Sequence, residues 1–241
     1  MQLKTIFKYR IKMKKLFVLL LVGSLFGLMS GCDMDDDECL NSVSDAWVGF
    51  GLVNKDASSE SYTIAMDDGE VLYPATNSVF DKDVFNNERV LVNFTILGNK
   101  NNPDHNEYYY VQINSLRKIL YKGIFDITPA KEDSIGNDPI LVKDKWVKNN
   151  MLNFELKYWG GNKTHFINLV KQPGAINTES GPVILELRHN NNDDTDGLPL
   201  SAYVSFDLSA LKVAGKSSTS FKVVAKGFDG KDFEYTGEYK Y

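Results

Sequence analysis

Along residues 45–127, apolar and polar positions alternate in short runs separated by turn-forming residues. Alternation with a period of two places successive side chains on opposite faces of a strand, so each run predicts a β-strand with one buried face. The predicted strands are Trp47–Val53, Ser61–Met66, Glu70–Tyr73, Arg89–Leu97 and Glu107–Ile113. Asp68-Gly69 predicts a type I′ hairpin turn, since both residues tolerate positive φ. Five strands predict a small barrel, and Ser115–Lys122 remains open between a short helix and a last strand.

Residues 140–241 show the same alternation without a long helical pattern. The predicted strands are Ile140–Val147, Met151–Tyr158, Thr164–Lys171, Val183–His189, Leu200–Phe206, Ser220–Lys226 and Asp232–Tyr239, with one helical turn at Asp207–Leu211. Seven strands without long helices predict an antiparallel β-sandwich. Residues 128–139 hold two prolines, a glycine and four charged residues, so we expect a linker there between a barrel domain at 45–127 and a sandwich domain at 140–241. One domain with a long loop is the alternative.

The first 31 residues carry six basic residues and no acidic ones, followed by the apolar run Leu16–Met29. This run is shorter than the roughly 20 residues that a membrane-spanning helix needs, and it is typical of a secretory signal peptide. Translation from Met1 or from Met13 would both give such a leader. Met29-Ser30-Gly31-Cys32 resembles a bacterial lipobox, with Met29 where leucine is usual. We therefore expect cleavage between Gly31 and Cys32 and lipidation of Cys32; an unmodified secretory signal is the alternative.

A lipidated Cys32 changes the charge and the cysteine count of the mature chain. It would hold 21 basic and 32 acidic residues, a net charge of −11, and Cys39 as its one thiol, which excludes an internal disulfide. Residues 32–44 contain a run of acids that predicts a solvated tether. Acids directly after a lipidated cysteine resemble the surface-export signal of some gram-negative lipoproteins. We expect an outer-membrane lipoprotein exposed at the cell surface, with the periplasmic face as the alternative.

Several segments, in this order, resemble the NigD-like lipoprotein family. They are "DDGEVLYPATN" at 67–77, "RVLVNFTILGN" at 89–99, "DSIGNDPI" at 133–140, "NNMLNFELKY" at 149–158, "HFINLV" at 165–170, "LELRHN" at 185–190 and "AYVSFDLSAL" at 202–211. The resemblance implies an all-β fold, with an N-terminal OB-like barrel followed by a C-terminal immunoglobulin-like sandwich. It also implies bacteriocin immunity as one role, by analogy with a founding member.

Catalytic and metal-binding motifs are weak in this chain. His105, His165 and His189 fall in separate segments without zinc-ligand spacing, and no G-x-S-x-G is present. The loop at 190–197 opens like a calcium loop but has Tyr203 where an EF-hand needs glutamate. A looser calcium site there is the alternative to a solvated connection. We expect no cofactor, no resident metal and no catalytic residue.

Aromatic residues are the candidate ligand contacts. Alternation places Tyr108 and Tyr110 on one face of a strand and Tyr109 on the other, and exposed aromatics of OB barrels stack on bases or sugars. Residues 43–127 hold 7 basic and 12 acidic residues, so a nucleic-acid partner is not expected. Trp159, beside Gly160-Gly161, is a second candidate sugar platform. For all three side chains, ordinary packing is the alternative.

Asp133-Ser134-Ile135 resembles an O-glycosylation acceptor of the Asp-Ser/Thr-apolar type, with Ser134 as the modified residue. Together, these observations predict a lipid-anchored protein without enzymatic activity that binds an unknown protein or glycan partner. An accessory glycan-binding or polysaccharide-hydrolysing lipoprotein is the competing class. Hydrolysis would require two carboxylates about 5 to 9.5 Å apart.

Overall fold

The computed structural model describes residues 46–241, except 57–60, 76–83, 101–107, 178–180 and 195–196. The leader, Gly31, Cys32 and the tether lie outside these residues and stay predictions. The described residues all belong to one compact unit. No helix in the described part has the length and apolar character needed to cross a bilayer.

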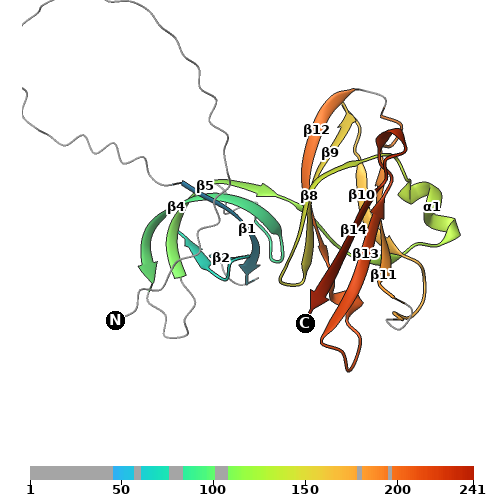
Figure 1. Ribbon diagram of the computed structural model, residues 1–241. Helices are drawn as coiled ribbons and strands as arrows, with labels where there is room; N and C mark the ends of the chain where they lie inside the picture. The colour runs from blue at the N-terminus through green and yellow to red at the C-terminus, as the bar shows by residue number, and fades with distance from the viewer. Residues whose placement is uncertain (1–45, 57–60, 76–83, 101–107, 178–180, 195–196) are drawn as a thin grey trace, which may run out of the picture. The chain divides into compact units, whose positions relative to one another are not determined.

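The N-terminal half closes into a five-stranded barrel (Figure 1). Its strands are β1 (Ala46–Lys55), β2 (Tyr62–Met66), β3 (Val71–Pro74), β4 (Arg89–Lys100) and β5 (Tyr108–Lys118), in the order β1-β2-β3-β5-β4. The inward positions of these strands form one apolar core that includes Val53, Ile64 and Val92, each 0% exposed. On β1, a Cβ atom at Gly51 would stand 2.5 Å from the Ile64 Cγ2 atom. Glycine is thus required there because the small barrel leaves no room for a side chain.

The hairpin between β2 and β3 is confirmed, but its predicted turn type is wrong. The amide of Gly69 bonds to the carbonyl of Met66, and the amide of Met66 bonds to the carbonyl of Glu70. Gly69 has a φ of 95°, whereas Asp68 is absent from the positive-φ residues. The loop Asp67–Gly69 is therefore a type I turn followed by a left-handed glycine, a three-residue connection. This longer loop carries the side chain of Asp67 on the turn.

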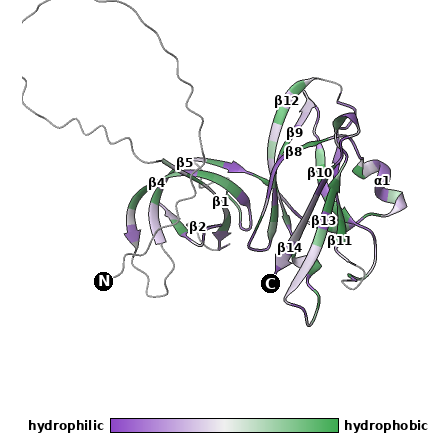
Figure 2. Ribbon diagram, viewed as in Figure 1, coloured by the Kyte–Doolittle hydropathy of each residue, from purple (hydrophilic) through white to green (hydrophobic). Residues whose placement is uncertain are grey.

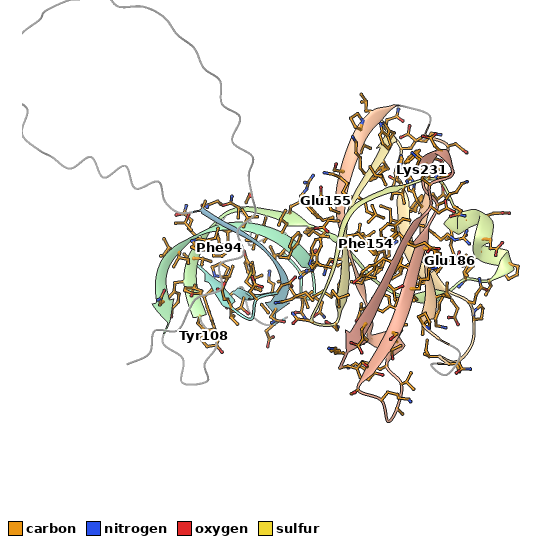
Figure 3. The ribbon with its side chains drawn as sticks, viewed as in Figure 1. Phe94, Tyr108, Phe154, Glu155, Glu186 and Lys231 are labelled. Carbon is orange, nitrogen blue, oxygen red and sulfur yellow. The ribbon has the colours of Figure 1, made fainter. Side chains whose placement is uncertain are left out.

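The C-terminal half is a sandwich of two sheets (Figure 1). The five-stranded sheet contains β14 (Phe233–Lys240), β13 (Ser218–Ala225), β11 (Val183–Asn190), β10 (Phe166–Lys171) and β7 (Phe125–Asp126), and the four-stranded sheet contains β6 (Leu120–Gly123), β12 (Leu198–Asp207), β9 (Met151–Gly160) and β8 (Leu141–Lys148). Phe154 is 0% exposed in the core between the sheets, while the neighbouring Glu155 is partly exposed (Figure 3). A barrel followed by a β-sandwich confirms the predicted all-β class.

The sandwich differs in detail from the antiparallel arrangement that we expected. Three of its described pairs, β10–β7, β11–β13 and β12–β6, are parallel. The strands β6 and β7 come from residues 120–126, which we had assigned to the end of the barrel domain. For the segment 115–122, a short helix and a strand were both predicted as alternatives. It is strand: its first residues end β5 and its last residues begin β6. Sequence alternation cannot show which sheet such short strands join, because that depends on distant partners.

The expected linker at 128–139 contains helix α1 (Pro129–Ile135), which is mostly hydrophilic (Figure 2). Ile135 is 5% exposed and forms a small cluster with Ile127, Val170 and Phe125. The segment is thus an internal connection of the sandwich, docked by one apolar residue. The helical turn expected at Asp207–Leu211 is confirmed as the 3₁₀ helix η2 (Ser209–Leu211), and a second one, η3 (Phe228–Gly230), joins β13 to β14.

Candidate functional site

A groove lies on the outer side of the five-stranded sheet, over the strands β11, β13 and β14. Its volume is about 520 Å³, within the usual range of ligand sites. Outward positions of three neighbouring strands supply its floor, and the segment after α1 and the β13–β14 connection supply its rims. The lining residues are Asn137, Glu186, Leu187, Arg188, Val224, Ala225, Lys226, Gly227, Gly230, Asp232 and Glu234.

The groove has mixed charge, and its carboxylates already have partners. The Nε atom of Arg188 donates to Glu186 at 2.7 Å, and Lys222 pairs with Glu234 at 2.9 Å. Asp232 accepts the backbone N–H of Gly227 at 3.1 Å. Fixed ion pairs beside the apolar Val224 suit hydrogen bonding to a polar ligand more than proton transfer. Figure 3 labels Glu186 on the β11 side of the sandwich.

The predicted tyrosine face exists on the outside of the barrel. Tyr108 and Tyr110 both pack on Tyr73, with ring centroids 5.5 and 6.0 Å apart, while Tyr109 packs against the barrel core. Tyr110 is 44% exposed. Parallel pairing of β3 with β5 places Tyr73 opposite Tyr110. Tyr73 was not predicted as part of this face, because its partners lie some 35 residues further along the chain.

Trp159 is the last residue but one of β9 and is 36% exposed. Its ring meets that of Phe228, on η3, edge to face at 4.9 Å, and the ammonium of Lys157 lies 5.1 Å from its centroid. Phe228 stands between Gly227 and Gly230, which line the groove. Trp159 is thus mostly covered by its neighbours, and its role as a ligand contact stays a prediction. Phe228 was not singled out from the sequence, since a lone aromatic in a turn gives no signal.

Two of the histidines, which lie 24 residues apart in the sequence, form a buried hydrogen-bonded pair. His165 Nδ1 lies 2.9 Å from His189 Nε2, and His189 Nδ1 lies 3.1 Å from the carbonyl oxygen of Pro139. That carbonyl can only accept, so Nδ1 of His189 donates and its Nε2 accepts from His165. Burial is the main cause that lowers the pKa of His189 below its usual 6.5. The ring of Tyr158 packs against both imidazoles.

The calcium alternative at 190–197 is only partly open to inspection, since 195–196 lie outside the described residues. The carboxylate of Asp194 is 2% exposed and accepts the backbone N–H groups of Gly161 and Lys163 at 2.8 and 3.1 Å. It also lies 3.4 Å from His165 Nε2. Asp194 therefore fastens the β9–β10 connection to this loop. Across the described residues, no group of three acidic, histidine or cysteine side chains could hold a metal.

Ser134 lies in the last turn of α1 and is exposed. Its hydroxyl donates to the carbonyl of Lys131 at 3.0 Å. The residue is accessible but helical, whereas we expected it in an irregular linker. Its glycosylation stays a prediction.

A buried arginine joins the two halves of the compact unit. Arg89, at the start of β4, is 1% exposed and forms a two-point ion pair with Asp67. It also donates to Asn153 on β9 at 3.1 Å and to Ser205 on β12 at 3.2 Å. Beside it, the ring of Phe50 packs on Trp146 and Tyr203, with centroids 5.4 and 5.3 Å apart. This network could not be predicted from the sequence, since a charged residue at the start of a strand is usually solvated.

Together these features define a two-domain β protein with an OB-like barrel, a sandwich and polar and aromatic surfaces. Residues 50–119 match the NigD-like N-terminal OB domain, and residues 123–239 match the NigD-like C-terminal beta sandwich domain. The chain therefore belongs to the NigD-like family. A search of curated proteins finds no match.

Three solved structures show the same fold. A putative toxin-related protein from Parabacteroides distasonis is 30% identical, with a TM-score of 0.68 over 81% of this chain and 94% of its own. A NigD-like immunity protein from Bacteroides caccae is 23% identical, with a TM-score of 0.60 over 80% and 96%. A putative lipoprotein from Bacteroides fragilis is 15% identical, with a TM-score of 0.58 over 81% and 98%.

Proposed function

We propose that this protein is a lipid-anchored outer-membrane protein, exposed at the cell surface, that binds a macromolecular partner without catalysis. The observation that carries this proposal is the groove on the five-stranded sheet. Its Arg188–Glu186 pair is partly buried, with side chains 15% and 22% exposed, so donors and acceptors are held in fixed positions. Pre-positioned polar groups beside apolar surface are typical of recognition sites.

The buried network of Arg89 supports a role in recognition. The guanidinium contacts the barrel turn and two sandwich strands, so these segments are already held in place before a ligand binds. Rigidity lowers the conformational entropy that binding would otherwise cost. The lipobox at Cys32 supports the anchor, since two or three acyl chains, at about 0.8 kcal/mol per buried CH₂ group, hold a protein firmly on a bilayer.

Affinity capture from intact cells tests the binding role. The acylated wild-type protein is compared with Lys226→Glu, which reverses an exposed charge of the groove. The matched control is Lys216→Glu, an exposed lysine of the same domain on the β12–β13 connection. We expect one protein or glycan species to be recovered with wild type and control and to be lost with Lys226→Glu. Equal recovery with all three proteins would exclude the groove as the binding surface.

The lipid anchor and the cell-surface localisation are tested separately. Metabolic labelling with palmitate should mark the wild-type protein and leave Cys32→Ala unlabelled and released from the membrane fraction. Protease added to intact cells should digest the wild-type protein at the surface. Full protection in intact cells, with digestion after lysis, would place the protein on the periplasmic face instead.

Immunity to a secreted toxin is a second candidate, favoured by the kinship with the Bacteroides caccae protein. Under this proposal the partner at the groove is a bacterial toxin. Deleting the gene would then sensitise cells to the culture fluid of a neighbouring strain, and restoring wild type but not Lys226→Glu would protect them. If wild type and Lys226→Glu both protected the cells, the groove would not be needed for immunity.

A further inference from the structure

Three exposed apolar side chains gather where the chain enters the barrel, and we call them the apolar rim. Trp47 and Val48, at the start of β1, are 52% and 63% exposed, and Leu97 on β4 is 57% exposed. Pairing places Ala46 opposite Thr95, and Leu97 follows Thr95 by two residues. Given a strand rise of about 3.3 Å and a strand spacing of about 4.8 Å, the Cα atoms of the three residues lie within about 15 Å of one another. Trp47 stands on the inward row of β1 at the open end of the barrel, and Val48 stands on the outward row beside it.

Trp47 prolongs the inward row of β1 beyond the packed interior. Gly49 and Gly51 precede the buried Val53 on that row, and a Cβ atom at Gly49 would stand 2.6 Å from the Cε atom of Met66. The residue opposite Trp47 is Phe94, which is 3% exposed. Trp47 therefore stands at the end of the inward row of the barrel, with about half of its surface in solvent. Single exposed apolar residues are ordinary, but a cluster containing tryptophan favours an interaction surface.

We infer that the apolar rim contacts the bilayer surface to which Cys32 anchors the chain, an inference that rests on the anchor proposed above. Thirteen residues separate Cys32 from Ala46, and at 3.3 to 3.6 Å per residue they span at most about 47 Å. A tether of this length holds the rim at an effective concentration near the millimolar range, so a weak contact is enough. Tryptophan is favoured at the headgroup level, where its ring is apolar and its N–H stays hydrated.

The charge of the tether indicates whether the membrane contact is electrostatic or apolar. Residues 33–45 contain six acidic and no basic residues, so they cannot attract anionic headgroups. Membrane contact of the rim therefore depends on apolar insertion. It occurs on neutral phosphatidylcholine and is insensitive to salt, unlike the contact of a polybasic segment.

Tryptophan fluorescence tests the inference on the acylated full-length protein. The chain contains three tryptophans, and the protein is reconstituted into phosphatidylcholine vesicles with brominated acyl chains as quenchers. We expect emission of the wild-type protein to shift to shorter wavelength and to be quenched. Trp47→Phe should abolish the quenching, whereas Trp159→Phe, another partly exposed tryptophan, should retain it. The double variant Val48→Gln/Leu97→Gln keeps Trp47 and should weaken the quenching.

Quenching that survives Trp47→Phe, or its absence in wild-type protein that floats with the vesicles, would overturn the inference. A second arm separates it from the anchor: the chain from Cys32 onward carries an N-terminal hexahistidine tag on vesicles with nickel-chelating lipid. One outcome is that the protein produced for acylation does not float with the vesicles, while the fluorescence of Trp47 in the tagged protein is quenched. The anchor proposal then fails and the rim inference stands. An unquenched tagged protein rejects the rim inference whatever the result of acylation.

Discussion

The guanidinium of Arg89 and the carboxylate of Asp67 form a two-point ion pair at 2.5 and 2.7 Å, with side chains 0% and 11% exposed. The amide of Asn153 and the hydroxyl of Ser205 complete the contacts of the guanidinium from the sandwich. A turn of the barrel therefore determines where a sandwich strand can lie. Desolvation makes such a pair weak evidence for stability, but the loss of one partner leaves a buried charge.

We expect Arg89→Met to lower the free energy of unfolding by about 3 to 5 kcal/mol, because Asp67 is left without its cation. Lys118→Met, which breaks the more exposed pair with Glu88, should cost less than about 1 kcal/mol. Urea unfolding followed by circular dichroism measures both values. Equal losses in the two variants would contradict the role of Arg89, and Asp67→Leu/Arg89→Met should recover part of the loss.

The His165–His189 pair makes stability depend on pH. Since burial lowers the pKa of His189 below 6.5, the unfolded chain binds this proton more readily than the folded protein does. The contribution of His189 to stability is therefore complete above pH 6.5 and is lost as the pH falls from 6.5 toward the lower pKa of the folded state. Protonation also places an N–H on Nε2, where His189 accepts from His165.

Urea unfolding of wild type and His189→Gln at pH 7.5, 6.5 and 5.5 isolates this contribution. The other titratable groups near the ring are His165, Asp138, Asp194 and Tyr158, and all of them stay in the variant. We expect the difference in stability between the two proteins to shrink as the pH falls. A constant difference across this range would show that His189 does not titrate there.

Gly51 tests how tightly the barrel is packed. An added methyl would stand 2.5 Å from Ile64 Cγ2 and 3.0 Å from the carbonyl oxygen of Ala65, so Gly51→Ala should cost about 1 to 3 kcal/mol. Gly98→Ala is the matched control, a strand glycine of the same barrel with no atom within 4 Å of the new methyl. Thermal unfolding compares them, and the two melting temperatures should differ clearly.

Substitution of Asp194 tests whether its carboxylate holds the loop in place or binds calcium. Asp194→Ala leaves the amides of Gly161 and Lys163 without their acceptor, and we expect a loss of about 1 to 3 kcal/mol. Asp193→Asn, in the exposed part of the same loop, should change little. Titration of the wild-type protein with millimolar calcium should give no heat and no rise in melting temperature. Binding heat that vanishes in Asp194→Ala would instead restore the calcium site.

The sequence by itself determined the two-domain β architecture. Strict alternation at positions such as Ile64, Leu185 and Leu187 leaves one buried face per strand, and period-two burial is a local property that no distant partner has to supply. It also placed Tyr108 and Tyr110 on one face. The predicted localisation at the outer membrane depends on the leader and on Cys32.

Tertiary structure alone decided which distant residues meet. Arg89 reaches Ser205 across 116 positions, His165 finds His189, and the strands β6 and β7 join the sandwich rather than the barrel. Each of these contacts depends on strand register and on the folding of connections back over a sheet. Local pattern sets the face of a residue but not its neighbour, because pairing between strands is fixed by the packing of the whole core.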